Sequence, residues 1–150
     1  MPDESGLDHD KKHMHMPIFT KLYLIAVPIF FLIDMLWLVV IAKGTYQKYL
    51  GHLMRPMPNW PVAILFYLLF IVGLVVFVVF PAVRNNSWSY ALLYGAMFGF
   101  FTYMTYDLTS LAVMKDFPWQ ITVIDIIWGT VLSSSVSVLT YLIFQAWSNK

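Results

Sequence analysis

Three aspartates interrupt the long apolar stretches of this sequence, and they are the residues best suited to chemistry. Asp34, Asp107 and Asp125 each lie inside a segment that predicts a membrane-spanning helix. A carboxylate at the centre of a bilayer costs about 2.5–3.5 kcal/mol even on the most lenient insertion scales. We therefore expect each aspartate to face protein, to interact with another polar group and to have a function.

The three aspartates are predicted to lie at one depth. Each is seven to nine residues from the lysine or proline that ends or begins its helix on the side of the 43–60 loop. At 1.5 Å per residue, this places all three carboxyls about 10–14 Å below the same interface. Tyr67 falls at the same level on another helix. The spacing therefore predicts one polar cluster, to which Thr109 and Ser110, just after Asp107, would add hydroxyls.

Two of the aspartates share a motif with tryptophan. Asp34 and Asp125 are followed three positions later by Trp37 and Trp128. Residues three apart lie on the same face of a helix, and an indole N–H is a hydrogen-bond donor. The motif predicts that an indole donates to the carboxylate of a neighbouring helix.

Composition places the chain in the membrane class. Of its 150 residues, 60% are hydrophobic and 11% are charged, which is not the composition of a soluble domain of this length. The formal net charge of +1 gives no support for a nucleic-acid partner or an acidic partner. The sequence has no cysteine, which excludes disulfides and thiolate chemistry.

Four apolar segments predict the elements that position the aspartates. Each is long enough to cross a hydrocarbon core of about 30 Å, and the short connections make neighbouring helices antiparallel. The predicted fold class is all-α: a polytopic membrane protein forming an antiparallel four-transmembrane-helix bundle in residues 18–150. Its helices are expected at about residues 18–42, 61–83, 88–114 and 118–147.

Both termini of such a bundle lie on one side of the membrane, and the balance of Lys and Arg leaves the orientation open. Residues 1–17 are polar and predict a flexible tail. The tail contains a His-Met-His-Met run at 13–16, but two histidines without a folded frame make a weak site for a soft metal. No metal site is predicted, and the cofactor is unknown.

Small residues indicate where two of the helices meet. Gly95 and Gly99 form a G-x-x-x-G face, and Gly129, Ser133 and Ser137 recur every four residues after Asp125. Small residues at this spacing let helix backbones approach closely in lipid. We also predict that the 43–60 loop covers the mouth of the cluster, with contact residues Tyr46, His52, Arg55 and Asn59.

Motifs along residues 20–147 resemble a family of small bacterial inner-membrane proteins catalogued as domain of unknown function 2177. The motifs that carry the resemblance are Asp34-x-x-Trp37-Leu38, Tyr46 with Leu50-Gly51, Pro58-Asn59-Trp60-Pro61, Tyr106-Asp107-Leu108-Thr109 and Asp125-x-x-Trp128-Gly129. The family commonly has Asn where this chain has Ser110. The resemblance implies a multi-pass protein of the inner (plasma) membrane with a shared polar cluster, and it implies no substrate.

Three interpretations of the cluster follow. In the favoured one, the carboxyls bind a cationic or amine-bearing small solute for binding or transport, and Trp37 and Trp128 add cation–π contacts. In the second, the protein is a membrane-embedded enzyme acting on a lipid or apolar substrate, and the carboxylates hold a divalent ion or act as a general acid. In the third, the protein is structural and the aspartates hold the helices together. The lipid bilayer is the expected environment, a homodimer would help a transporter open, and no catalytic residue is assigned.

Overall fold

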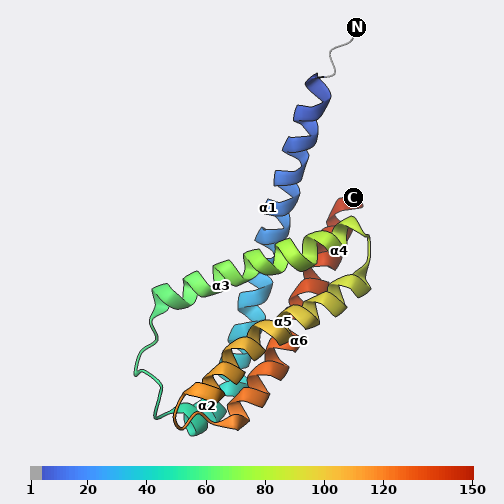
Figure 1. Ribbon diagram of the computed structural model, residues 1–150. Helices are drawn as coiled ribbons and strands as arrows, with labels where there is room; N and C mark the ends of the chain where they lie inside the picture. The colour runs from blue at the N-terminus through green and yellow to red at the C-terminus, as the bar shows by residue number, and fades with distance from the viewer. Residues whose placement is uncertain (1–4) are drawn as a thin grey trace.

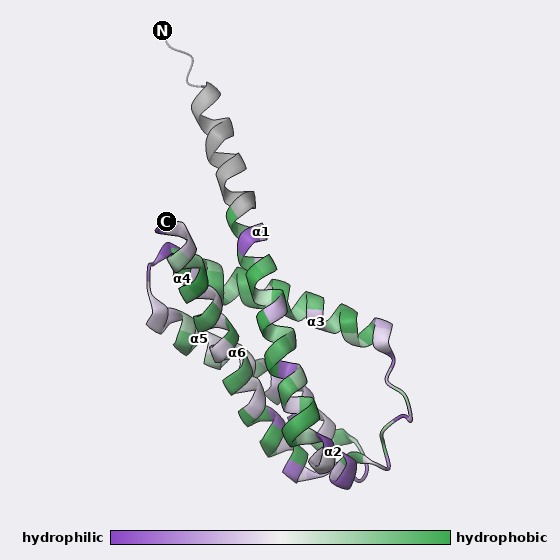
Figure 2. Cartoon of the chain, turned by 180° about the vertical axis from the view of Figure 1, so that it is seen from behind, coloured by the Kyte–Doolittle hydropathy of each residue, from purple (hydrophilic) through white to green (hydrophobic). Residues whose placement is uncertain are grey.

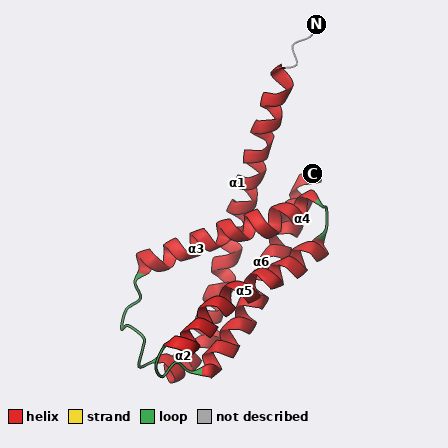
Figure 3. Cartoon of the chain, in the orientation of Figure 1, coloured by secondary structure: helices red, strands yellow, loops and turns green. Residues whose placement is uncertain are grey.

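A computed structural model describes the backbone of residues 5–150 and the side chains from Ile18 onward. All regular structure in this part of the chain is helical (Figure 3). The elements in chain order are α1 (Ser5–Leu36), η1 (Trp37–Ala42), α2 (Lys43–Leu50), α3 (Trp60–Leu74), η2 (Val75–Val79), α4 (Phe80–Arg84), α5 (Trp88–Val113) and α6 (Trp119–Ser148), where η marks a π-helical segment.

The elements form four long helical segments, which confirms the predicted all-α membrane fold. Three of the segments are long and apolar enough to cross a membrane, namely Ile18–Leu50, Trp60–Arg84 and Trp119–Ser148. The remaining one, α5, has 26 residues and is not among these candidate spans, so its predicted passage through the bilayer stays a prediction. Most of the helical length is hydrophobic (Figure 2), and many large apolar side chains are exposed on its surface, as a lipid environment requires.

The first helix extends further than predicted. A Lys43-Gly44 stop was expected near residue 42, but α2 continues the helix to Leu50, and only residues 51–59 form the connection to α3. Lys43 has ordinary right-handed helical angles, and Gly44 is exposed with no atom that a Cβ would meet. Because the sequence has no proline between Lys43 and Pro56, nothing in this stretch forces the helix to end. Tyr46 is consequently a helical residue rather than a loop residue.

Helices α5 and α6 are packed side by side along their length (Figure 1), through the small residues that the sequence indicated. A Cβ added at Gly95 would lie 2.9 Å from Ser137 Oγ, and one at Gly99 would lie 2.6 Å from Ser133 Oγ. These separations are shorter than real carbon–oxygen contacts, so the backbones approach too closely for any larger residue. The predicted close contact is confirmed.

The second segment packs on the others mainly through its C-terminal half. Ile71, Leu74 and Val75 are fully buried in a core with Phe30 of α1 and Leu132 of α6. The N-terminal end of α3 instead stands apart from the other helices (Figures 1 and 2), and most side chains of residues 60–66 are exposed. The arrangement is therefore a helical bundle with one splayed segment, and the splay leaves space beside the aspartates.

The prediction for the N-terminal tail concerns residues of which little is described. Residues 1–4 lie outside the described part, and only the helical backbone of residues 5–17 is given, as the start of α1. The His-Met-His-Met run at 13–16 is among them. The flexible tail and its weak metal affinity therefore stay predictions.

Candidate functional site

Asp34 of α1 is bonded to a tryptophan of another helix, as the Asp-x-x-Trp motif predicted. The side chain is 5% exposed, and Trp128 Nε1 of α6 donates to Asp34 Oδ1 at 3.3 Å. Tyr67 of α3 lies close enough to interact with the same carboxyl. The predicted shared level of Asp34 and Tyr67 thus corresponds to a real proximity.

The tryptophans of the two motifs lie against each other. The rings of Trp37 and Trp128 stack with their centroids 4.3 Å apart and their planes 7° from parallel. The buried Trp37 Nε1 has no acceptor in hydrogen-bonding geometry, and its neighbour is Tyr46. This stack joins the first segment to α6, and each of its tryptophans lies about one helical turn from the aspartate of its own motif.

Asp125 of α6 receives a hydrogen bond from Tyr46 of α2. Tyr46 reaches the cluster because the first helix continues past Ala42, which returns its side chain to α6. Tyr46 was predicted as a contact residue of the 43–60 loop, whereas the structure places it on α2; its role in ligand binding stays a prediction. Asp125 itself is half-buried, one turn before the close α5–α6 contact at Gly129.

Asp107 of α5 is the most enclosed of the three. It is 0% exposed, and neither of its carboxylate oxygens has a hydrogen-bond donor. It lies two turns after Gly99 on the face of α5 that packs on α6, where Thr122 Oγ1 donates to its backbone carbonyl at 3.5 Å. The group that interacts with its carboxyl is the Asp125 carboxyl. Two carboxyls thus meet at the α5–α6 contact with no donor between them.

Two adjoining hollows open beside these side chains. The smaller is about 190 Å³ and is lined by Asp34, Trp37, Leu38, Tyr46, Phe66, Tyr67, Tyr103, Asp125 and Trp128. The larger is about 370 Å³ and is lined by Phe66, Phe70, Thr102, Tyr103, Tyr106 and Asp125. Phe66, Tyr103 and Asp125 belong to both linings, so the two hollows adjoin each other beside the splayed α3.

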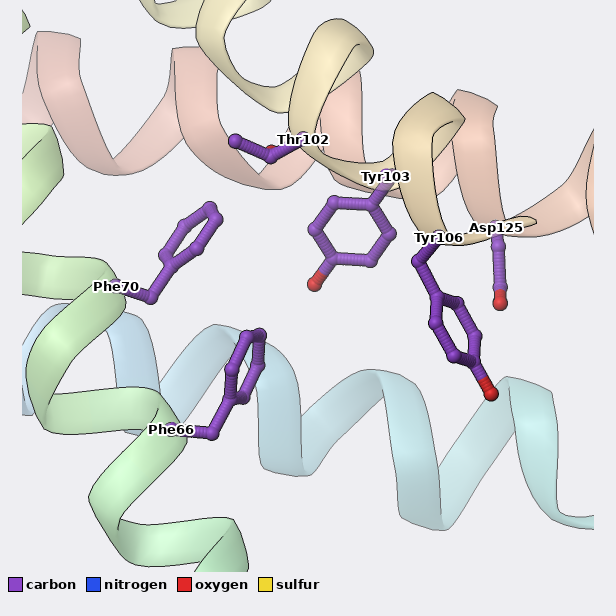
Figure 4. A pocket seen from close by; sticks show the side chains of 6 residues that line it. All are labelled: Phe66, Phe70, Thr102, Tyr103, Tyr106 and Asp125. Carbon is purple, nitrogen blue, oxygen red and sulfur yellow. The ribbon is translucent and has the colours of Figure 1, made fainter. Parts of the chain in front are cut away.

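Figure 4 shows how the larger hollow is built. Phe66 and Phe70 project from α3 toward Tyr103 and Tyr106 of α5, and Asp125 stands beside Tyr106 at one end. The wall is aromatic on both sides, with one carboxylate. A cavity of this size and character is typical of small-molecule sites, which are largely apolar with a few polar groups that orient the ligand.

The remaining candidates on α5 line neither hollow. Ser110 is 7% exposed and follows Asp107 by about one turn on the same face. Thr109 is exposed, and its hydroxyl donates to the carbonyls of Thr105 and Tyr106 on its own helix. A role in ligand binding stays a prediction for both, and the contacts of Thr109 are those of an ordinary helical threonine.

The candidates in the 51–59 connection lie away from the cluster. His52 Nε2 is 3.3 Å from the carbonyl of Asp116, and the Asn59 side chain caps α3 by accepting from the Val62 N–H at 3.5 Å. Arg55 is exposed. None of the three lines either hollow, so their predicted coverage of the mouth stays a prediction.

Six residues line the hollows without having been predicted to, namely Leu38, Phe66, Phe70, Thr102, Tyr103 and Tyr106. A signal for some of them exists in the sequence. Phe66 and Phe70 flank Tyr67 at a spacing of four, which puts them on one face of α3, and Tyr103 precedes Asp107 by four on α5. Among the described residues, no group of three or more His, Cys, Asp or Glu side chains is arranged to hold a metal ion.

Comparison with known families assigns the chain. The family described as predicted membrane protein (DUF2177) matches residues 19–142. The chain belongs to this family. The match includes all three aspartates and both Asp-x-x-Trp motifs, so the cluster lies inside the part of the chain that defines the family. No curated protein and no solved structure matches. DUF2177 membership thus confirms the membrane class and the predicted family, and its description names no activity.

Proposed function

We propose that this DUF2177 protein binds an organic cation, within the membrane, in the hollow lined by Asp34 and Asp125. The observation that carries the proposal is an aromatic cavity beside the carboxyls of Asp107 and Asp125. These two carboxyls meet with no hydrogen-bond donor between them. No basic side chain is among the groups that act on these carboxyls in the described chain. A bound cation would supply the missing positive charge.

The carboxyls would provide the attraction. Two of them, Asp34 and Asp125, line the smaller hollow, whereas Asp107 adds negative charge from behind Asp125. Charged groups inside a membrane protein are expensive and usually pair with one another or mark the path of a substrate. With little surrounding water, their attraction for a cation exceeds its value in solution.

The aromatic lining would select an organic cation over a hydrated metal ion. Trp37, Trp128, Tyr46, Tyr67 and Tyr103 surround the smaller hollow. A cation over an aromatic face gains about 0.5–2 kcal/mol, with Trp the best partner. Phe66 and Phe70 extend this surface into the larger hollow, where an apolar substituent of the ligand would be buried. A small inorganic ion gains nothing from that apolar wall.

The alternatives account for fewer of these features. Aspartates that serve only to hold helices together would be expected to have donors, but Asp107 has none, and such a role gives no reason for the hollow. A divalent ion such as Mg²⁺ keeps several of its waters when it binds carboxylates, so a site for such an ion gives no reason for the aromatic wall of the hollow. The cation-binding proposal uses the carboxyls, the rings and the hollow together.

The test uses two ions of matched shape and opposite charge. The purified chain in non-ionic detergent would be dialysed against tetraphenylphosphonium or tetraphenylborate, with protein-free micelles as the background. We expect saturable binding of the phosphonium ion only. Asp34→Asn and Asp125→Asn should each weaken it at least tenfold, which corresponds to about 1.4 kcal/mol.

The matched control is Asp116→Asn. Asp116 is an exposed acid in the turn between α5 and α6, on the same side as the cluster, and its positive φ of 63° suits Asn well. This variant should bind as the wild type does. Equal binding of both ions, or wild-type affinity in folded Asp125→Asn, would refute the proposal.

A further inference from the structure

We propose that cation binding releases one proton, which the Asp107 and Asp125 carboxyls share when the site is empty. The protein would then exchange a proton for an organic cation at a single site. This inference rests on the function proposed above and adds its coupling to pH. It starts from Asp107, from its burial and its lack of a hydrogen-bond donor. The cation-binding proposal gives Asp107 no direct contact with the ligand.

Asp107 is out of reach of the ligand. It is 0% exposed and lines neither hollow, whereas Asp125 lines both. A cation in the hollow therefore contacts Asp125, and Asp107 acts only through Asp125. The Asp125 carboxyl thus borders the hollow, and the Asp107 carboxyl lies on the far side of Asp125 from it.

The count of donors indicates a shared proton. Asp125 accepts a hydrogen bond from Tyr46, but both oxygens of Asp107 are buried without a donor, and the group that they meet is the Asp125 carboxyl. Two carboxylates at close range cannot readily both be ionised, because each charge destabilises the other. One proton between them removes half of the charge and provides the donor that Asp107 lacks.

The surroundings of the pair offer no other source of positive charge. Tyr46 of α2 and Tyr103 of α5 interact with the pair, and Asp34 and Tyr67 line the smaller hollow together with Asp125. The basic side chains and the histidine of this half of the molecule are all exposed, and they are Lys43, Lys48, His52, Arg55 and Lys115. In the described chain, the neutralising group for Asp107 and Asp125 is therefore either a proton or the ligand.

The exchange balances in charge. The empty pair holds one proton and one negative charge. When the cation binds at Asp125, the O–H bond of the pair breaks, the proton leaves to water, and the two carboxylates are left facing one positive charge, with Asp34 nearby. No covalent bond to the ligand forms. Affinity then rises with pH by up to tenfold per unit in the range where the pair holds its proton, because each binding event releases one proton.

The experiment counts protons directly. Tetraphenylphosphonium is added to the full-length protein in weakly buffered detergent solution containing a pH-indicator dye, and dialysis gives the amount bound. This ion carries no titratable proton, so any released proton comes from the protein. We expect close to one proton per bound ion in the wild type and in Asp116→Asn.

Asp107→Asn separates the two proposals. Its amide can donate to Asp125, so the contact between helices is kept while the shared proton is removed. This variant should still bind the phosphonium ion through Asp125 and should release close to no proton. Binding by the wild type without proton release would overturn the exchange and leave the cation site standing. Absence of binding by the wild type would overturn both proposals. If Asp107→Asn does not fold, the wild-type proton count still decides the exchange.

Discussion

Replacing Gly99 by alanine tests whether the α5–α6 contact is as close as described. An added Cβ would overlap the Gly129 carbonyl and lie 2.6 Å from Ser133 Oγ, and the first of these is backbone that cannot rotate away. The two helices must therefore separate locally. Overpacking of this kind costs about 1–3 kcal/mol. The same separation would move Asp107 away from Asp125, because both lie along this contact.

Gly44→Ala is the matched control for this substitution. Gly44 is a helical glycine in α2 with nothing within 4 Å of its Cβ position, so alanine should stabilise the helix by up to about 1 kcal/mol. Thermal unfolding in detergent, followed by circular dichroism, compares the two. With about 2–4 °C per kcal/mol for a chain of this size, Gly99→Ala should lower Tm by about 2–12 °C while Gly44→Ala leaves it equal or higher.

The result that refutes the reasoning is equal stability of the two variants. It would mean that α5 and α6 do not meet at Gly99, and the pairing of Asp107 with Asp125 would lose its support. A lower Tm for Gly99→Ala accompanied by unchanged cation binding would be a different result. It would support the contact while showing that the binding site tolerates its widening.

Three further outcomes follow from single contacts. Tyr46→Phe removes the donor to Asp125 and should lower the free energy of unfolding by about 1.5–3 kcal/mol. Tyr49→Phe on the same helix should change this free energy little in the same thermal unfolding assay. Equal effects of the two variants would contradict the hydrogen bond from Tyr46 to Asp125. Trp128→Phe removes the donor to Asp34 and should reduce the fluorescence change on phosphonium binding, leaving the part that comes from Trp37, which lines the same hollow. Trp119→Phe, at a position 62% exposed, should keep the whole change, and an equal loss in both variants would contradict binding at this hollow. Millimolar Mg²⁺ should leave Tm unchanged, since an ion that keeps its waters gains nothing from the aromatic lining of the hollow. A rise in Tm that Asp125→Asn removes would favour the enzyme interpretation instead.

Much of the site could be predicted because depth in a membrane can be counted along a helix. Asp34 and Tyr67 were expected at one level and interact. The Asp-x-x-Trp motif predicted an indole bond between helices, and Trp128 makes one. The G-x-x-x-G pattern predicted the close contact at Gly95 and Gly99. Each of these signals depends on spacing within one helix, which the sequence states directly.

The rest depends on how helices turn and tilt relative to one another, which spacing does not encode. Lys43-Gly44 has the residues of a helix end, yet the chain continues to Leu50, and this continuation brings Tyr46 to Asp125. Counting residues from the helix end gives the depth of Phe66 in the membrane. It does not reveal that α3 stands apart from the other helices, so that Phe66 lines a hollow. The larger hollow was therefore missed, although every aromatic side chain that lines it was visible in the sequence.

The contrast between the two halves of the molecule bears on whether cation binding leads to transport. At the level of the aspartates, α3 is splayed and the hollow is open along one side. Further along α6, Ser133 and Ser137 are buried against the glycine face of α5, and a Cβ at Gly95 already has no room. A cation cannot continue between α5 and α6 unless these helices part. The open half therefore suits loading of the site from one direction. Passage across the membrane would require a second arrangement, in which α3 closes over the hollow while the α5–α6 contact opens. The N-terminal half of α3 has few contacts that would oppose this movement.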